Sequence, residues 1–203
     1  MRQKRQKRNL KPRFAVLGEG ITEQWYLQHL KEFKGYVYKI SPSLFADVGI
    51  EKAEGHIDRL LNEGYDQVTF LTDYDTIVSQ EKQAVFDRFV EKYEAVDEVL
   101  ICDSMPAIEL WFLLHFVYTA REFPDCAQLV GQLRQYLPGY EKRKSYLGKA
   151  QWFAEMIKGE PEAVERAERL LNQMGEGNVG KHFPYSKMPQ ALLEFDKQKA
   201  KRS

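Results

Sequence analysis

Short apolar segments alternate with amphipathic ones over the first 120 residues of the chain. The apolar segments are rich in β-branched and aromatic residues, which predicts strands, and the amphipathic segments carry apolar residues at intervals of three and four, which predicts helices. The predicted strands are residues 13–18, 36–40, 67–71 and 98–102. The predicted helices are residues 23–33, 50–62, 79–93 and 108–117. This alternation predicts an α/β fold with a mostly parallel sheet and helices on both faces.

The pattern changes after about residue 120. Helical patterns then follow one another without strands between them, over residues 127–137, 146–158, 161–174 and 189–201. We therefore predict three parts: a flexible basic arm (1–12), an α/β core (13–120) and a C-terminal helical extension packed on the core (121–203).

Charge is distributed unevenly along the chain. The formal net charge is +0, but residues 1–18 contain seven Lys or Arg and no acid. Such an arm is suited to lie along phosphates, and a solvated terminal tail is the alternative interpretation. The hydrophobic content of 43% is that of a folded protein rather than a disordered one.

Two classes of protein are disfavoured by the sequence. No stretch approaches the ~20 apolar residues of a membrane span, and the longest apolar run is interrupted by Glu109 and His115. No secretory signal follows the basic arm. Cys102 and Cys126 lack a CxxC spacing, so we interpret them as reduced thiols of a cytoplasmic protein.

Acidic residues follow three of the predicted strands. Glu19 and Glu23 come after the first strand, Asp73 and Asp75 after the third, and Asp103 after the fourth. The carboxyl ends of parallel strands lie at one edge of a sheet, where clustered carboxylates repel one another. A Mg²⁺ or Mn²⁺ ion would neutralise them and would position a phosphodiester. For any single acid, a helix cap or a surface charge is the alternative.

The same residues resemble a known domain. Glu19-Gly20-x-Thr22-Glu23 after a strand, with Asp73-x-Asp75 after a later strand, resembles the Toprim domain of topoisomerases, primases and OLD-family nucleases. The wider pattern resembles the RloB family, which is found with restriction-modification and phage-defence genes. The further motifs that carry this resemblance are Ser104–Phe116, Tyr140–Lys142 and Asn178–Val179.

The resemblance implies both a fold and an activity. The fold would be Toprim-like (Rossmann-like), and the activity would be metal-dependent cleavage of DNA or RNA in phage defence or nucleic-acid processing. Glu19 would be a metal ligand or general base, Asp73 and Asp75 would hold Mg²⁺ or Mn²⁺, and Glu23 would serve a second ion or orient the other ligands. An ATPase partner protein is also implied, because OLD-type Toprim domains commonly work with one.

Other polar residues are candidates to complete the site. Four lie near the predicted metal edge: Thr22, Asp103, Ser104 and Glu109. Glu109 stands in an apolar helix, where an unpaired charge is costly, so it either reaches the metal edge or pairs with a Lys or a backbone group. The candidate phosphate or nucleic-acid contacts are Lys142, Arg143, Lys144, Lys181 and His182. For residues 142–144, a solvated loop is equally compatible with the sequence.

Two other functions remain open at this point. Phe70–Thr76 also resembles the DxDxT motif of haloacid-dehalogenase-type phosphatases, in which Asp73 would be the nucleophile and Asp75 the acid/base. That motif normally follows the first strand rather than the third, and this interpretation leaves Glu19 and Glu23 unexplained. The other alternative is a non-catalytic defence component that binds nucleic acid or a nucleotide.

Overall fold

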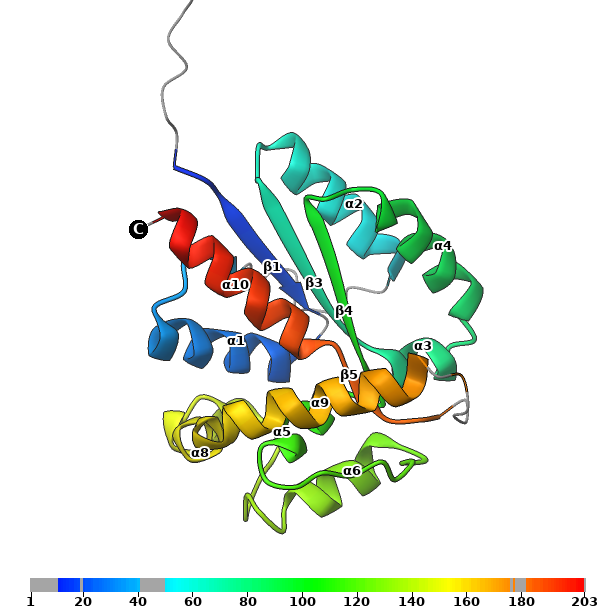
Figure 1. The fold of residues 1–203 in the computed structure, drawn as a ribbon, viewed down its shortest axis with the longest axis vertical. Helices are drawn as coiled ribbons and strands as arrows, with labels where there is room; N and C mark the ends of the chain where they lie inside the picture. The colour runs from blue at the N-terminus through cyan, green and yellow to red at the C-terminus, as the bar shows by residue number, and fades with distance from the viewer. Residues whose placement is uncertain (1–10, 19, 41–49, 176, 178–181, 203) are drawn as a thin grey trace, which may run out of the picture.

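One five-stranded sheet organises the chain (Figure 1). The computed structural model describes residues 11–18, 20–40, 50–175, 177 and 182–202, so residues 1–10 of the predicted basic arm lie outside it. The strands are β1 (Phe14–Gly18), β2 (Lys39–Ile40), β3 (Gln67–Asp73), β4 (Val99–Met105) and β5 (Tyr185–Ser186). Their order is β2-β1-β3-β4-β5, with β1 to β4 parallel and β5 antiparallel to β4.

The central strands are apolar because both of their faces are covered. All five residues of β1 are buried, which is the pattern of a parallel strand between two helical layers. The register pairs Val16 with Thr69 and Phe70 with Ile101, so the three long strands end close together. This shared end positions the acidic residues that follow or finish the strands.

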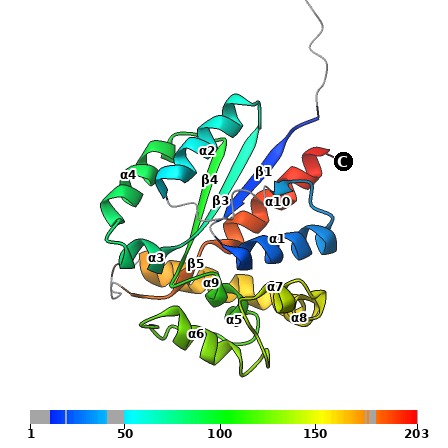
Figure 2. The same ribbon diagram turned by 180° about the vertical axis from the view of Figure 1, so that it is seen from behind.

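Helices cover both faces of the sheet (Figures 1 and 2). On one face, α2 (Ile50–Asn62), α3 (Tyr74–Ser79) and α4 (Gln83–Glu94) contribute to a hydrophobic cluster with Ala15 and Phe70. On the other face lie α1 (Ile21–Lys34) and α10 (Met188–Arg202), which share a second cluster with Val16 and Leu71. The predicted α/β architecture with a mostly parallel sheet is confirmed.

The remaining helices gather near the carboxyl ends of the strands (Figure 1). They are α5 (Glu109–Leu114), α6 (Cys126–Leu133), α7 (Lys144–Leu147), α8 (Ala150–Met156), the 3₁₀ helix η2 (Ile157–Gly159) and α9 (Glu160–Gly175). Every residue of α5 is buried, as its apolar sequence predicts. Its apolar side chains belong to the same hydrophobic cluster as those of α1 and α10.

The structure differs from the sequence predictions in two details. The C-terminal part is helical as predicted, but it also contains β5, which returns to the sheet and pairs with the end of β4. A two-residue strand is too short to produce an alternating pattern that the sequence would reveal. The helix predicted over residues 79–93 begins later, since α4 starts at Gln83, and α3 (Tyr74–Ser79) is an additional helix that the sequence did not predict; Glu81, which lies between the two helices, takes a positive φ of 54°.

In the part of the chain that the structure describes, no helix combines the length and the apolar character needed to cross a membrane.

Candidate metal and phosphate site

The site begins at Asp73, the last residue of β3. Its Oδ1 accepts a hydrogen bond of 2.8 Å from the backbone N–H of Ile108, just before α5 begins. The backbone N–H of Asp75 in turn donates to the carbonyl of Pro106 over 3.0 Å. These two bonds tie the end of β3 to the segment between β4 and α5, so the Asp73 carboxylate is held in one position.

Glu23 approaches Asp73 from the first turn of α1. Its side chain is 4% exposed, and its Oε2 is buried without a hydrogen-bond partner among the described residues. A Cβ atom on Gly20 would lie 2.5 Å from that oxygen. Gly20 is the N-cap of the helix. Glycine at position 20 therefore leaves space for the Glu23 carboxylate in this position.

Glu109 supplies a third carboxylate and is fully buried. Its Oε1 accepts a hydrogen bond of 2.8 Å from the Tyr140 hydroxyl and lies 3.0 Å from the Lys142 ammonium. Thr22 also interacts with the Tyr140 hydroxyl. Of the two roles that the sequence left open for Glu109, pairing with a lysine is observed, and the Glu109 carboxylate also interacts electrostatically with the other two acids. No pattern in the sequence indicates that Tyr140 would hold this carboxylate.

The three carboxylates share a strongly unfavourable environment for negative charge. Burial, followed by repulsion from Glu109, raises the pKa of Glu23 to about 7. Burial, followed by Glu23 and Glu109, raises the pKa of Asp73 well above its usual value. Lys142 opposes both shifts. One ammonium group therefore compensates only part of the negative charge of three acids.

Cys126 and Lys142 close one side of this cluster. The Lys142 ammonium lies 3.3 Å from the Cys126 sulfur, which in turn lies 3.6 Å from Oε2 of Glu109. Burial and then Glu109 raise the pKa of the Cys126 thiol to about 12, so it remains protonated at neutral pH. Burial alone would lower the pKa of Lys142, but the Glu109 carboxylate raises it. Lys142 therefore stays charged.

The chemistry of this donor set fits a hard divalent cation. Among the described residues, no group of three or more His, Cys, Asp or Glu side chains is arranged to hold a metal ion. Glu19, the first predicted ligand, lies outside the described residues. The unpartnered Oε2 of Glu23 and the Asp73 carboxylate are nevertheless buried oxygen donors whose negative charge Lys142 compensates only in part. Oxygen donors of this kind suit Mg²⁺ or Mn²⁺.

Asp75 lies beside this cluster rather than within it. It occupies the first turn of α3 and is partly buried, and burial raises its pKa. Asp75 also lines a pocket of about 220 Å³ together with Phe123, Asp125 and His182. His182, a candidate phosphate contact, is thus near Asp75. Lys181 lies outside the described residues.

The structure does not bring Asp103 to the carboxylate cluster. Asp103 is paired with Thr72 in the sheet, whereas Ser104 is paired with Asp73. Because successive side chains of a strand point to opposite faces, Asp103 faces away from Asp73. It is bound there by Tyr185 and Lys187. Ser104 lies on the Asp73 face, but its hydroxyl is hydrogen-bonded to Ser186 over 2.8 Å.

The basic segment around Lys142 divides into two environments. Lys142 points to the carboxylates, with its side chain 40% exposed. Arg143 is exposed and lies 3.7 Å from Glu141, and Lys144 is exposed at the start of α7. Of the three predicted basic contacts, only Lys142 is joined to the carboxylate cluster by a described interaction.

A known family model covers the part of the chain that forms this site. The model of the family described as RloB-like protein matches residues 14–194, which is most of the 203-residue chain. The chain belongs to the RloB-like protein family. The match includes Glu23, Asp73, Glu109 and Lys142, so the whole described cluster lies within the RloB-like region. Membership of the RloB-like family suggests a protein associated with restriction-modification. Searches of curated proteins and of solved structures gave no significant match.

Proposed function

We propose that this RloB-like protein is a Mg²⁺- or Mn²⁺-dependent nuclease of the Toprim type that cleaves phosphodiesters of DNA or RNA in phage defence or nucleic-acid processing. The observation that supports it most directly is the convergence of Glu23, Asp73 and Glu109 from α1, β3 and α5 around one lysine. Buried like charges destabilise a fold. Their presence at the carboxyl edge of a parallel sheet favours a functional rather than a structural origin.

Glu23 and Asp73, with Glu19 and Asp75, are the residues that would hold the ion. When bound, the ion would supply Lewis-acid polarisation of the phosphate and a water of lowered pKa. Glu23 and Asp73 must both lose their protons before they bind the ion. The pKa of Glu23, raised to about 7, makes its deprotonation dependent on pH near neutrality, and the pKa of Asp73 is raised in the same direction.

Lys142 has a separate role in this proposal. Its ammonium is held by the buried Glu109 carboxylate while 40% of the side chain remains exposed. A cation fixed in this way is suited to attract a phosphate without blocking the metal ligands. Tyr140, which donates to the same Glu109 oxygen, keeps that carboxylate oriented toward Lys142.

The proposal is tested with Asp73→Asn. We expect this substitution to abolish cleavage of DNA and RNA substrates in Mn²⁺, and to weaken Mn²⁺ binding in calorimetry by about tenfold or more, because one charged ligand is lost. Asp97→Asn, which changes an exposed aspartate outside the site, is the matched control and should retain full activity. Circular dichroism should show that both variants are folded.

The results separate nuclease function from a non-catalytic binding role. Cleavage by Asp73→Asn at the wild-type rate would refute the assignment of the site. If the wild-type protein binds Mn²⁺ and nucleic acid but leaves single- and double-stranded DNA and RNA intact, the non-catalytic defence component becomes the better description.

A further inference from the structure

The outer edge of β4 is covered only at one end. β5 pairs with Ser104 and Met105, and no described strand pairs with residues 99–102 on that side. The side chains of Val99, Leu100 and Ile101 are only partly buried. An open strand edge of this kind is a template for pairing with another extended segment.

The backbone of Ile101 offers both of its hydrogen-bonding groups at this edge. The Val68 N–H donates to Glu98 O over 2.8 Å, and the Lys187 N–H donates to Asp103 O over 3.1 Å from the opposite side. Since successive residues of a strand alternate between its two neighbours, Glu98 and Leu100 face β3, whereas Ile101 and Asp103 face outward. No described residue hydrogen-bonds to the Ile101 backbone on the outer side.

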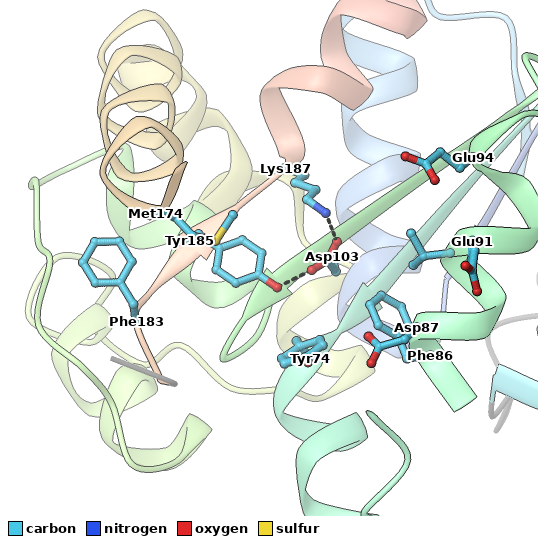
Figure 3. Close-up of a pocket in the computed structure, with 11 residues that line it drawn as sticks. Tyr74, Phe86, Asp87, Glu91, Glu94, Asp103, Met174, Phe183, Tyr185 and Lys187 are labelled. Atoms are coloured by element: carbon cyan, nitrogen blue, oxygen red, sulfur yellow. Dashed lines mark hydrogen bonds and ion pairs between the residues drawn. The ribbon is translucent and has the colours of Figure 1, made fainter. Parts of the chain in front are cut away.

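A groove of about 550 Å³ lies between α4 and the strands β4 and β5, and Asp103, two residues beyond Ile101, is the β4 residue that lines it (Figure 3). Aromatic rings from three elements line it, and Tyr74 has its ring centroid 5.4 Å from that of Phe86 and 6.5 Å from that of Tyr185. Among the described lining residues, the only ammonium group is that of Lys187, and it is engaged by Asp103 at 2.7 Å. This part of the surface thus combines apolar and aromatic side chains with a cation that is already paired.

The wall formed by α4 is acidic. Asp87, Glu91 and Glu94 line the groove, are exposed, and have no hydrogen bond or ion pair with any other described residue. Their spacing of four and three residues places them on one helix face. Burial is the largest cause that raises the pKa of Tyr74, and the negative charges of Asp87 and Asp103 add to it.

We propose that this groove binds an extended basic segment of a partner protein, which adds as a strand to the open edge of β4. Its backbone would pair with Ile101, and its Lys or Arg side chains on the α4 side would meet Asp87, Glu91 and Glu94. Strand addition supplies affinity through main-chain hydrogen bonds and specificity through alternate side chains.

The spacing of the acids supports an extended occupant with basic residues at alternate positions. Along a helix, Asp87 and Glu91 are separated by about 6 Å, because each residue rises about 1.5 Å. Alternate residues of a strand are separated by about 6.6 Å. Lys or Arg side chains at every second position of the segment therefore have nearly the same spacing as these two carboxylates.

Charge also decides against other occupants. Nucleic acid would place phosphates against an acidic wall. A second copy of this chain, paired edge to edge through β4 by a two-fold axis perpendicular to the sheet, would bring α4 against α4 and oppose acid to acid. Both arrangements are repulsive, so a basic protein segment is the occupant that the groove favours. This inference is independent of the proposed nuclease activity.

The test uses the full chain and a fluorescein-labelled nonapeptide in which lysine alternates with valine. A second peptide has the same composition with its lysines grouped together. Fluorescence anisotropy should show binding of the alternating peptide about tenfold tighter than that of the grouped one, because only the first matches the edge and the wall together. Equal affinities for the two peptides would overturn the proposal.

Protein variants localise the binding. The double variant Glu91→Lys/Glu94→Lys should weaken binding of the alternating peptide by about tenfold or more, because two attractions become repulsions. Glu165→Lys, the same change on an exposed face of α9 outside the groove, should change the affinity by less than about twofold. An unchanged affinity in the double variant contradicts the proposal.

Two measurements distinguish strand addition from other modes of binding. Hydrogen exchange followed by NMR should show slower exchange of the Ile101 amide when the alternating peptide is bound, and unaltered exchange there refutes pairing at the edge. Spermidine should not displace the peptide at equal charge concentration, and displacement would identify a polyamine site instead. If analytical ultracentrifugation shows that the wild-type protein is a dimer and that the Glu91→Lys/Glu94→Lys variant is a monomer, the occupant is a second copy of the chain.

Discussion

Gly20→Ala tests whether the position of one carboxylate controls the site. The backbone of Gly20 has φ −133° and ψ 169°, which alanine adopts without strain. The added Cβ would nevertheless lie 2.5 Å from Oε2 of Glu23, whereas ordinary contacts begin at 3.4 Å. The carboxylate, as the end of a flexible side chain, must therefore move by the difference of about 0.9 Å.

We expect Gly20→Ala to lower the rate of cleavage much more than the free energy of unfolding. A displacement of about 1 Å in a catalytic group typically costs on the order of 10²-fold in rate. We therefore expect cleavage in Mn²⁺ to fall by about that factor, and Mn²⁺ affinity measured by calorimetry to fall as well. Replacing glycine at an N-cap with alanine lowers the free energy of unfolding by only about 1 kcal/mol. Urea denaturation measures that second quantity.

The matched control is Gly55→Ala in α2, where an added Cβ would meet no atom within 4 Å. This change should leave cleavage unaltered and raise the free energy of unfolding by about 0.5–1 kcal/mol, since alanine is the better helix former. Wild-type cleavage and Mn²⁺ affinity in Gly20→Ala would show that Glu23 need not occupy its present position. The requirement for glycine at position 20 would then be refuted.

Two further substitutions test the charge balance of the cluster. The folded-state pKa of Glu23 is raised from 4.5 to about 7. Between these two pH values the folded protein therefore binds more protons than the unfolded chain. The free energy of unfolding falls as the pH rises through this range, by up to about 3 kcal/mol. Glu23→Gln should therefore be more stable than the wild type at pH 8 in EDTA but similar to it near pH 4, as measured by urea denaturation; a variant less stable at pH 8 contradicts this reasoning. Lys142→Met should lower the free energy of unfolding by about 1–3 kcal/mol, because Glu109 loses its cation while it stays fully buried, and the double variant Lys142→Met/Glu109→Gln should recover part of that loss.

The α/β architecture could be predicted from the sequence because it depends on local patterns of apolar and polar residues. Apolar strands such as β1 and amphipathic helices such as α2 carry periodicities that survive without knowledge of their neighbours. β5 shows the limit of this approach. Its two residues become a strand only because the end of β4 offers them hydrogen bonds. That partner is separated from Ser186 by 82 positions along the chain.

The residues of the candidate site could be predicted only in part, for a different reason. Asp73 and Asp103 both lie near the carboxyl ends of strands. The parallel topology predicts that these ends lie at the same edge of the sheet. Which face each side chain takes depends on the register and length of the strand, and β4 runs three residues beyond its predicted end. That difference places Asp103 inside the strand, facing the groove beside α4, where Tyr185 and Lys187 bind it.

The pairing of Glu109 with Lys142 and Tyr140 lay beyond any local pattern. A buried glutamate in an apolar helix requires a partner, and the sequence could state that requirement but not identify the residue that meets it. Lys142 follows Glu109 by 33 positions and lies in a segment whose composition equally suits a solvated loop. Only the packing of α5 against the α6 region and the loop that follows it brings the ammonium within 3.0 Å of the carboxylate. The same packing gives the buried Glu109 carboxylate a cation and brings three acids and one lysine together.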